Sequence, residues 1–233
     1  MTIRALATDY DGTIATHGEV PASVVSALER FRASGRPILL VTGRRLPSLR
    51  EVFPGFEMFD AVVAENGALL YRPATREEVS LAPPPPPAFL AALARRGVTP
   101  ELGRTIVATE ATREPELAAA IAETGVAWRV ILNKDSAMCL PAGVDKASGL
   151  EHALGALGLA AADVAGVGDA ENDLDFLARC GLAAAVANAL PEVRAAADLV
   201  TEEEEGAGVA WLIERVLAGE TFPSRRVSAG ARP

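Results

Sequence analysis

The stretch that decides the fold is a mostly apolar run ending in two aspartates, IRALATDYDGT, residues 3–13. Residues 3–8 are typical of a short buried strand, and Asp9-Tyr10-Asp11-Gly12-Thr13 is typical of the polar turn that follows one. Gly12 allows a sharp turn in which backbone N–H groups face an anion. Because Asp-x-Asp-Gly turns are common in ordinary loops, it is the place of this turn at the end of a buried strand that indicates chemistry.

The same alternation of apolar strands and amphipathic helices continues along the chain. Strands that are apolar on both faces and alternate with helices predict a doubly wound parallel sheet, a Rossmann-like α/β core covered on both sides. The expected strands of this core are residues 3–8, 37–41, 61–64, 164–167 and 182–186, and its expected helices are 21–35, 46–53, one from Val144, one after 173, one from Pro191 and 208–218.

Residues 73–142 interrupt that pattern with a small α/β unit of their own. Its expected elements are a hairpin of residues 68–72 and 77–81, helices at 89–96 and 115–124, and strands at 105–108, 127–132 and 137–140. The Pro83–Pro87 run is interpreted as a stiff connector, with a partner-recognition segment as the alternative. We therefore predict a core of residues 1–72 and 143–220, an insert of 73–142 and a flexible tail of 221–233.

Composition excludes several classes of protein. The chain has 233 residues, of which 50% are hydrophobic, which is too many for a disordered chain. The net charge of −9 argues against a nucleic-acid binder, which needs basic residues to replace counterions. No apolar stretch approaches the roughly 18–20 residues of a membrane span, and we expect no membrane partner. Residues 1–8 carry no secretory signal and Cys139 and Cys180 match no metal spacing, so we expect a cytoplasmic protein with two buried thiols.

Polar residues gather where the predicted strands end. They are Asp9, Asp11, Thr42, Glu65, Asn66, Asp169, Asn172 and Asp173, with Lys146 at the start of the helix that returns to the core. Ligands of open parallel sheets bind beyond the carboxyl ends of the strands. Carboxylates this close repel one another unless a cation neutralises them, and Mg²⁺ is the cation that favours oxygen ligands and keeps a substrate phosphate in its shell.

A Mg²⁺ ion beside a lysine and a threonine hydroxyl makes a phosphate site. Phosphoryl transfer needs an in-line nucleophile, a proton source for the leaving oxygen and charge neutralisation. One carboxylate of the metal shell can be the nucleophile and form an aspartyl-phosphate, while the carboxylate two residues later can protonate the leaving alkoxide and then deprotonate water. These residues predict a Mg²⁺-dependent phosphatase that acts on a small phosphorylated metabolite.

The motifs, taken in order, resemble those of haloacid dehalogenase superfamily phosphatases. Asp9–Thr13, Thr42-Gly43-Arg44, Lys146 and Gly168–Asp173 look like the four motifs of that family, and Glu65-Asn66-Gly67 resembles its Cof-type branch. The cap domain of that branch lies between the second and third motifs, which is where the insert lies here. The resemblance covers about residues 1–70 and 143–218.

The resemblance implies a role for each matching residue. Asp9 would be the nucleophile and Asp11 the general acid/base, while Thr42 and Lys146 would hold the phosphoryl oxygens. The Mg²⁺ ligands would be Asp9, Asp11 through its main-chain carbonyl, Asp169 and Asp173, and the substrate-binding residues would be Gly43, Arg44, Asn66 and Asn172.

Several alternatives stay open at this level. The substrate is expected to be a sugar phosphate, phosphoglycolate or a sugar-phosphoglycerate. The candidates for binding a second anionic group on it are Arg44, Arg45, Arg129 and Lys134. A phosphosugar mutase on the same scaffold and a non-enzymatic receiver module with a phospho-aspartate are the competing functions. The protein is expected to be a monomer or a homodimer.

Overall fold

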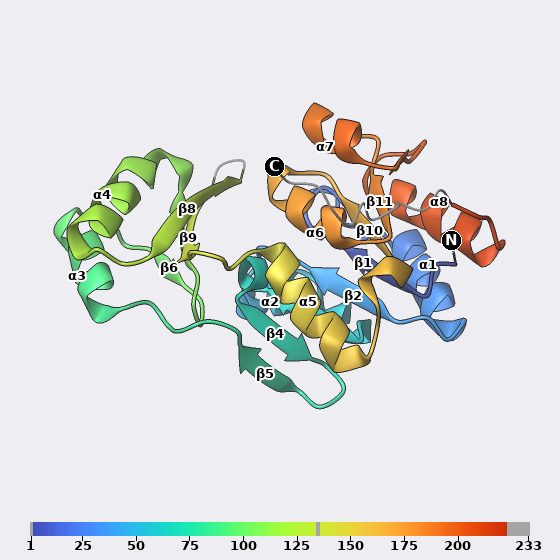
Figure 1. Cartoon of the computed structure of the whole chain (residues 1–233), viewed down its shortest axis with the longest axis horizontal. Coiled ribbons are helices and arrows are strands. Elements are labelled where there is room, and N and C mark those ends of the chain that lie inside the picture. Colours follow the sequence, from blue (N-terminus) through green and yellow to red (C-terminus); the bar gives the residue numbers. More distant parts are fainter. Residues whose placement is uncertain (1, 134–135, 223–233) are drawn as a thin grey trace, which may run out of the picture.

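Two β-sheets of unequal size organise the chain in the computed structural model, which describes residues 2–133 and 136–222 (Figure 1). The larger sheet has eight strands in the order β12-β11-β10-β1-β2-β3-β4-β5. In chain order they are β1 (Ala5–Thr8), β2 (Ile38–Val41), β3 (Ala61–Ala64), β4 (Leu69–Arg72), β5 (Glu77–Ser80), β10 (Val164–Gly168), β11 (Leu182–Ala185) and β12 (Leu199–Val200).

The predicted parallel core is confirmed. Every neighbouring pair from β12 to β3 is parallel, and β1, β2, β3, β10 and β11 are buried along their whole length. Burial on both faces explains why these strands are continuous apolar runs with no alternation. The strand order reverses direction at β1, since the chain runs outward through β2 and β3 on one side and through β10, β11 and β12 on the other.

Helices flank this sheet in pairs. α1 packs against α8, and α5 packs against α6 and against β2, β3 and β4. In Figure 1, α5 crosses in front of the sheet. The helices are α1 (Ala22–Ala33), α2 (Leu46–Val52), α5 (Lys146–Leu157), α6 (Leu174–Arg179), α7 (Pro191–Ala196) and α8 (Glu205–Leu217), with 3₁₀ turns at Pro54–Met58, Glu65–Gly67, Ala161–Asp163 and Glu171–Asp173.

The smaller sheet has a core of its own. It has four antiparallel strands in the order β6-β7-β9-β8, and helices α3 and α4 pack against each other beside it. Phe89 and Leu93 of α3 meet Leu117 of α4 and Val107 of β7 in an apolar cluster separate from that of the large sheet. The elements are α3 (Pro87–Arg95), β6 (Glu101–Leu102), β7 (Val107–Glu110), a 3₁₀ turn (Ala111–Arg113), α4 (Glu114–Thr124), β8 (Trp128–Asn133) and β9 (Ser136–Pro141).

The second strand of the expected hairpin belongs to the large sheet, not to the insert. β5 pairs with β4 from Leu69↔Ser80 to Arg72↔Glu77, so the large sheet continues eight residues past the predicted boundary at Arg72. A hairpin partner is fixed by its turn, and β4 is itself bound to β3. We therefore propose that the insert spans about residues 82–142, with Pro83–Pro86 leading from β5 to α3.

Both ends of the insert meet at Ala68, the residue before β4. Leu81 donates its backbone N–H to the carbonyl of Ala68 at 2.8 Å, and Val144 packs against the small apolar cluster of Ala68, Ile106, Met138 and Leu140. The chain therefore leaves the large sheet and returns to it at nearly the same place.

The remaining predictions for the fold have mixed outcomes. Cys139 and Cys180 are both buried, as expected. The two-residue strands β6 and β12 were not predicted, because so short a segment shows no periodicity. Of the predicted tail 221–233, residues 223–233 lie outside the described residues, as does Lys134. Within residues 2–133 and 136–222, none of the helices has the length and apolar content to cross a bilayer.

Two glycines of α5 give a matched test of this packing. A Cβ on Gly149 would lie 2.5 Å from Cγ1 of Val63 and 2.6 Å from Cα of Gly67, whereas one on Gly155 would meet nothing within 4 Å. We expect Gly149→Ala to lower the free energy of unfolding by about 1–3 kcal/mol through overpacking. Gly155→Ala should leave it unchanged or raise it by up to about 1 kcal/mol, the gain in helix propensity. Urea unfolding measures both, and equal effects of the two changes would contradict the packing described.

Candidate active site

The acidic residues meet at the point where the strand order reverses. Asp9 directly follows β1 and Asp169 directly follows β10, and these strands are parallel neighbours with Thr8 opposite Val167. The backbone N–H of Asp9 bonds to the carbonyl of Val167 at 3.0 Å, which carries the pairing up to the site. Such reversal points leave a crevice beyond the strand ends, where open α/β sheets bind their ligands.

A cluster of three buried carboxylates fills this crevice. Asp9, Asp169 and Asp173 each offer an oxygen, and these oxygens all lie within 4.8 Å of one another. Asp173 is fixed by the backbone N–H groups of Asp169 and Ala170, which bond to its Oδ2 at 2.9 and 3.0 Å. The hydroxyl of Thr13 donates to Oδ1 of Asp169 at 2.9 Å. Asp173 and Asp169 are therefore held in place by hydrogen bonds.

Lys146 supplies a positive charge to the cluster. It is the first residue of α5 and is 1% exposed, and its Nζ lies 2.5 Å from Oδ1 of Asp9 and 2.6 Å from Oδ1 of Asp173. Burial alone would lower the pKa of Lys146, but the carboxylates of Asp173 and Asp9 outweigh burial and raise that pKa above its ordinary value. The side chain of Asp145 caps α5 by accepting from the N–H of Ser148 at 2.8 Å, which fixes the start of the helix.

The cluster carries more negative charge than Lys146 balances. By formal charge, three carboxylates and one ammonium leave two negative charges in a buried space. Burial raises the pKa of Asp9 most, Lys146 opposes that rise, and the nearby carboxylates of Asp173 and Asp169 raise it further. A divalent cation would neutralise this excess, and an all-oxygen donor set is the kind that Mg²⁺ prefers. The three acids therefore form a group that could hold a metal ion.

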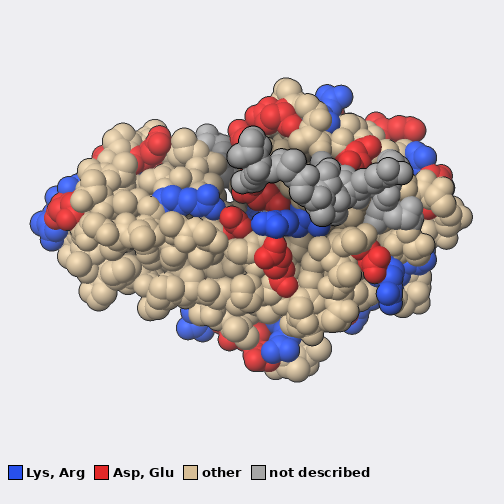
Figure 2. Space-filling view, in the orientation of Figure 1, with Lys and Arg blue, Asp and Glu red and all other residues tan. Residues whose placement is uncertain are grey.

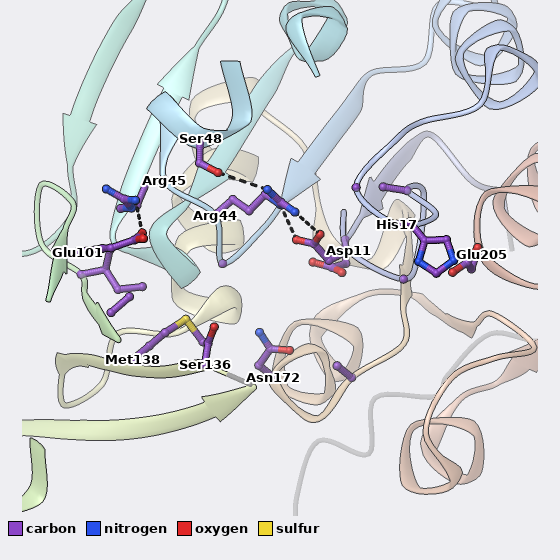
Figure 3. Close-up of a pocket in the computed structure, with 18 residues that line it drawn as sticks. Asp11, His17, Arg44, Arg45, Ser48, Glu101, Ser136, Met138, Asn172 and Glu205 are labelled. Carbon is purple, nitrogen blue, oxygen red and sulfur yellow. Dashed lines mark hydrogen bonds and ion pairs between the residues drawn. The ribbon is translucent and has the colours of Figure 1, made fainter. Parts of the chain in front are cut away.

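The carboxylate of Asp11 points away from this cluster and toward Arg44. Nε and Nη2 of Arg44 each lie 2.7 Å from one of its oxygens, in the two-pronged geometry of a strong ion pair (Figure 3). The guanidinium also lies over the ring of Tyr10, with its carbon 5.1 Å from the ring centre. Tyr10 is buried and donates to the carbonyl of Gly18 at 2.8 Å, so the residue between the two aspartates anchors the turn.

Thr42, Gly43 and the two asparagines lie around the same crevice. Thr42 is fully buried, and its hydroxyl accepts from the backbone N–H of Arg44 at 3.1 Å. The amide of Asn172 donates to Oδ1 of Asn66 at 3.1 Å. Oδ1 of Asn172 is buried and has no hydrogen-bond partner among the described residues.

A cleft of about 550 Å³ opens in front of these residues, between the two sheets. The large sheet contributes Asp9, Asp11, Gly43, Arg44 and Asn172, and the insert contributes Glu101, Ile106, Ala108, Ser136 and Met138. Figure 3 shows Arg44 and Arg45 on one wall and Met138 and Ser136 across from them. On the face shown in Figure 2, acidic and basic side chains are scattered and do not gather in one patch of single sign.

Sequence reasoning missed the role of Thr13 and the contact of Arg45 with the insert. Thr13 was quoted in the first motif but given no role, and a threonine after an Asp-Gly turn carries no signal of its own. Arg45 joins the insert by pairing with Glu101 and by donating to the carbonyl of Leu102 at 3.2 Å. No sequence pattern links Thr13 with Asp169 or Arg45 with Glu101, because the two members of each pair lie far apart in the chain.

Comparison with known proteins gives a consistent picture. A model of the family of haloacid dehalogenase-like hydrolases matches residues 6–83 and 113–213. A phosphoglycolate phosphatase of Methanothermobacter thermautotrophicus is 32% identical over 92% of this chain and 99% of its own, and phosphoglycolate phosphatase 1 of Saccharolobus solfataricus is 29% identical over 94% and 97%. A haloacid dehalogenase-like hydrolase from Bacteroides thetaiotaomicron shares the fold with a TM-score of 0.75 at 19% identity, over 92% of this chain and all of the other.

The charge excess predicts that Mg²⁺ stabilises the folded protein. A ligand at a hundredfold excess over its Kd adds about 2.7 kcal/mol to the free energy of unfolding, so Mg²⁺ should raise the Tm of the wild type in a thermal-shift titration. Asp169→Asn should reduce the rise, because it removes one of the three clustered acids. Asp175→Asn, which changes an exposed aspartate of α6, is the control and should respond as the wild type does. An equal rise in all three proteins would argue against a metal at this cluster.

Proposed function

Because the chain belongs to the haloacid dehalogenase-like hydrolases and is a phosphatase of small phosphate esters, we propose that it works through an aspartyl-phosphate on Asp9 with Mg²⁺ as cofactor. The observation that carries this proposal is the buried contact of Asp9 with Lys146 beside Asp169 and Asp173. A nucleophilic carboxylate needs a cation close by to receive the phosphoryl oxygens, and Lys146 is such a cation.

The donor set at the strand ends supports Mg²⁺. Asp9, Asp169 and the main-chain carbonyl of Asp11 would hold the ion, and Asp173 would contribute through water, since both of its oxygens already accept hydrogen bonds from Lys146 or the backbone. When bound, Mg²⁺ neutralises the negative charge shared by the phosphoryl group and the carboxylates and so lowers the electrostatic barrier to attack.

The reaction has two steps on this chain's residues. A carboxylate oxygen of Asp9 attacks phosphorus, the bond from phosphorus to the ester oxygen breaks, and Asp11, protonated from solvent, gives its proton to that oxygen. Water then attacks phosphorus and gives a proton to Asp11, and the bond from phosphorus to Asp9 breaks to release inorganic phosphate. Lys146 and the hydroxyl of Thr42 bind the phosphoryl oxygens in both steps.

Arg44 links this chemistry to the charge of the substrate. In the structure its guanidinium donates to both carboxylate oxygens of Asp11, so that neither oxygen is free to serve a leaving group. An anionic group on the substrate competes for the same guanidinium. When Arg44 turns to that group, Asp11 is released for proton transfer.

We accordingly propose a small substrate with a carboxylate in addition to its phosphate. The relatives named above are phosphoglycolate phosphatases. Arg44 and Arg45 lie on one wall of the cleft. Phosphoglycolate itself carries the phosphate and the carboxylate that this arrangement fits, so it is the first compound to test.

Substitution of Asp9 tests the proposed intermediate. Asp9→Asn keeps the shape of the side chain but removes the nucleophilic charge, so we expect phosphate release to fall by at least about 10³-fold. Asp11→Asn should slow both steps, because Asp11 protonates the leaving oxygen in the first and takes a proton from water in the second. The measurement is phosphate and alcohol release from phosphoglycolate with and without EDTA. Activity that survives Asp9→Asn would contradict the mechanism, and transfer of phosphate without release would indicate a mutase.

Arg45 gives a test of the substrate's second charge. A hydrogen bond to a charged group contributes about 1.5–3 kcal/mol, so Arg45→Ala should raise the KM for phosphoglycolate about ten- to a hundredfold. The KM for p-nitrophenyl phosphate, which lacks a carboxylate, should change little. Arg50→Ala is the matched control, because Arg50 lies on α2, the helix that Arg45 precedes, but pairs with Glu78 away from the cleft. Equal effects on both substrates would argue against a carboxylate contact at Arg45.

A further inference from the structure

The turn Glu65–Gly67 has an unusual backbone for its sequence. Glu65, Asn66 and Gly67 all have positive φ, at 53°, 54° and 105°. Glycine adopts this region freely, but glutamate and asparagine do so at a cost, and such conformations persist only where the surroundings hold them. Glu65 is also 1% exposed, which is rare for a glutamate. A strained and buried acid of this kind calls for a specific partner.

The partner is the turn between β6 and β7 of the insert. The carboxylate of Glu65 accepts three successive backbone N–H groups, from Arg104 at 2.8 Å, Thr105 at 2.9 Å and Ile106 at 3.0 Å. Three converging amides make a nest that binds an anion, and here the anion is a side chain of the large sheet. Gly103 makes the approach possible, because a Cβ there would lie 2.4 Å from Oε1 of Glu65.

The other two residues of the turn contact the phosphate side of the site. Oδ1 of Asn66 accepts from the amide of Asn172, which lines the cleft. Gly67 lies so close to the start of α5 that a Cβ on it would be 1.8 Å from the carbonyl oxygen of Asp145, the residue before Lys146. One short turn thus touches the insert, the loop of Asn172 and the helix that carries Lys146.

We propose that Glu65 is a positioning residue that holds the insert's wall of the cleft at a fixed place relative to the phosphate site. This proposal rests on the proposed function, and it gives the insert's wall of the cleft a role in selecting the substrate. Ile106 connects the two roles, since its N–H bonds to Glu65 while its residue lines the cleft, as does Ala108 two positions further along β7. Replacing one carboxylate oxygen by an NH2 group would bring a donor against these N–H groups, and the β6–β7 turn is then free to shift.

The predicted consequence is a loss of discrimination between substrates. If the insert's wall of the cleft moves, it no longer holds a small anionic substrate next to Arg44 and Arg45. The positions of Asp9 and Lys146 do not change. Selectivity for phosphoglycolate over p-nitrophenyl phosphate should therefore fall, mainly through KM, while kcat on p-nitrophenyl phosphate is retained. A residue that merely stabilises the fold would not separate the two substrates in this way.

The test compares Glu65→Gln with Glu78→Gln in the full chain. Glu78 also binds Arg104, but through the exposed guanidinium and not the backbone, so it is a matched control. We expect Glu65→Gln to speed hydrogen exchange at the amides of residues 104–106 about tenfold or more. Its ratio of kcat/KM for the two substrates should fall about tenfold, with kcat on p-nitrophenyl phosphate within about threefold of wild type. Glu78→Gln should change neither.

Gly103→Ala tests the same contact with Glu65 intact, because the added methyl group would collide with the carboxylate. It should reproduce the faster exchange and the lower selectivity. Unchanged exchange at 104–106, or unchanged selectivity, in correctly folded Glu65→Gln and Gly103→Ala would overturn the proposal. If the wild type releases no phosphate from either substrate, the proposed function fails, and the exchange measurement alone then supports or overturns the anchoring by Glu65.

Discussion

The site depends on the balance of charge between Lys146 and the buried carboxylates of Asp9, Asp169 and Asp173. Ionised acids packed this closely in a protein interior repel one another strongly. They cannot separate here, because β1 and β10 are hydrogen-bonded neighbours and place Asp9 beside Asp169. The strand pairing therefore fixes the repulsion between these carboxylates. Their negative charge attracts cations to this position, and a bound cation can in turn attract a phosphate group.

The order of elements along the chain follows from the same constraint. Lys146 must reach Asp9 from outside the sheet, and it does so as the first residue of α5, which begins directly after the insert. The insert consequently ends next to the chemistry. It supplies Ile106 and Met138 as one wall of the cleft without altering a strand of the large sheet. One wall of the cleft and the cluster of acids with Lys146 are thus placed on separate bodies.

Much of the large sheet, and the gathering of acids at its edge, could be predicted from the sequence, because a buried parallel strand is a continuous apolar run and its end is marked by a polar turn. Family resemblance, and not any local pattern, was needed to single out Lys146. The contacts around the cleft could not be predicted from the sequence. The pairing of Asp11 with Arg44 and the capture of three amides by Glu65 depend on how two sheets pack. β5 was assigned to the wrong body for a related reason, since a hairpin pattern does not say which sheet it joins.

The meeting of both ends of the insert at Ala68 has a consequence for how such proteins diverge. A segment whose ends adjoin can be lengthened, trimmed or exchanged for an unrelated one while the strands around it keep their places. Evolution can then change the substrate specificity by replacing the insert, while the large sheet and its reaction stay the same. A replacement insert would need a turn whose backbone N–H groups bind the carboxylate of Glu65.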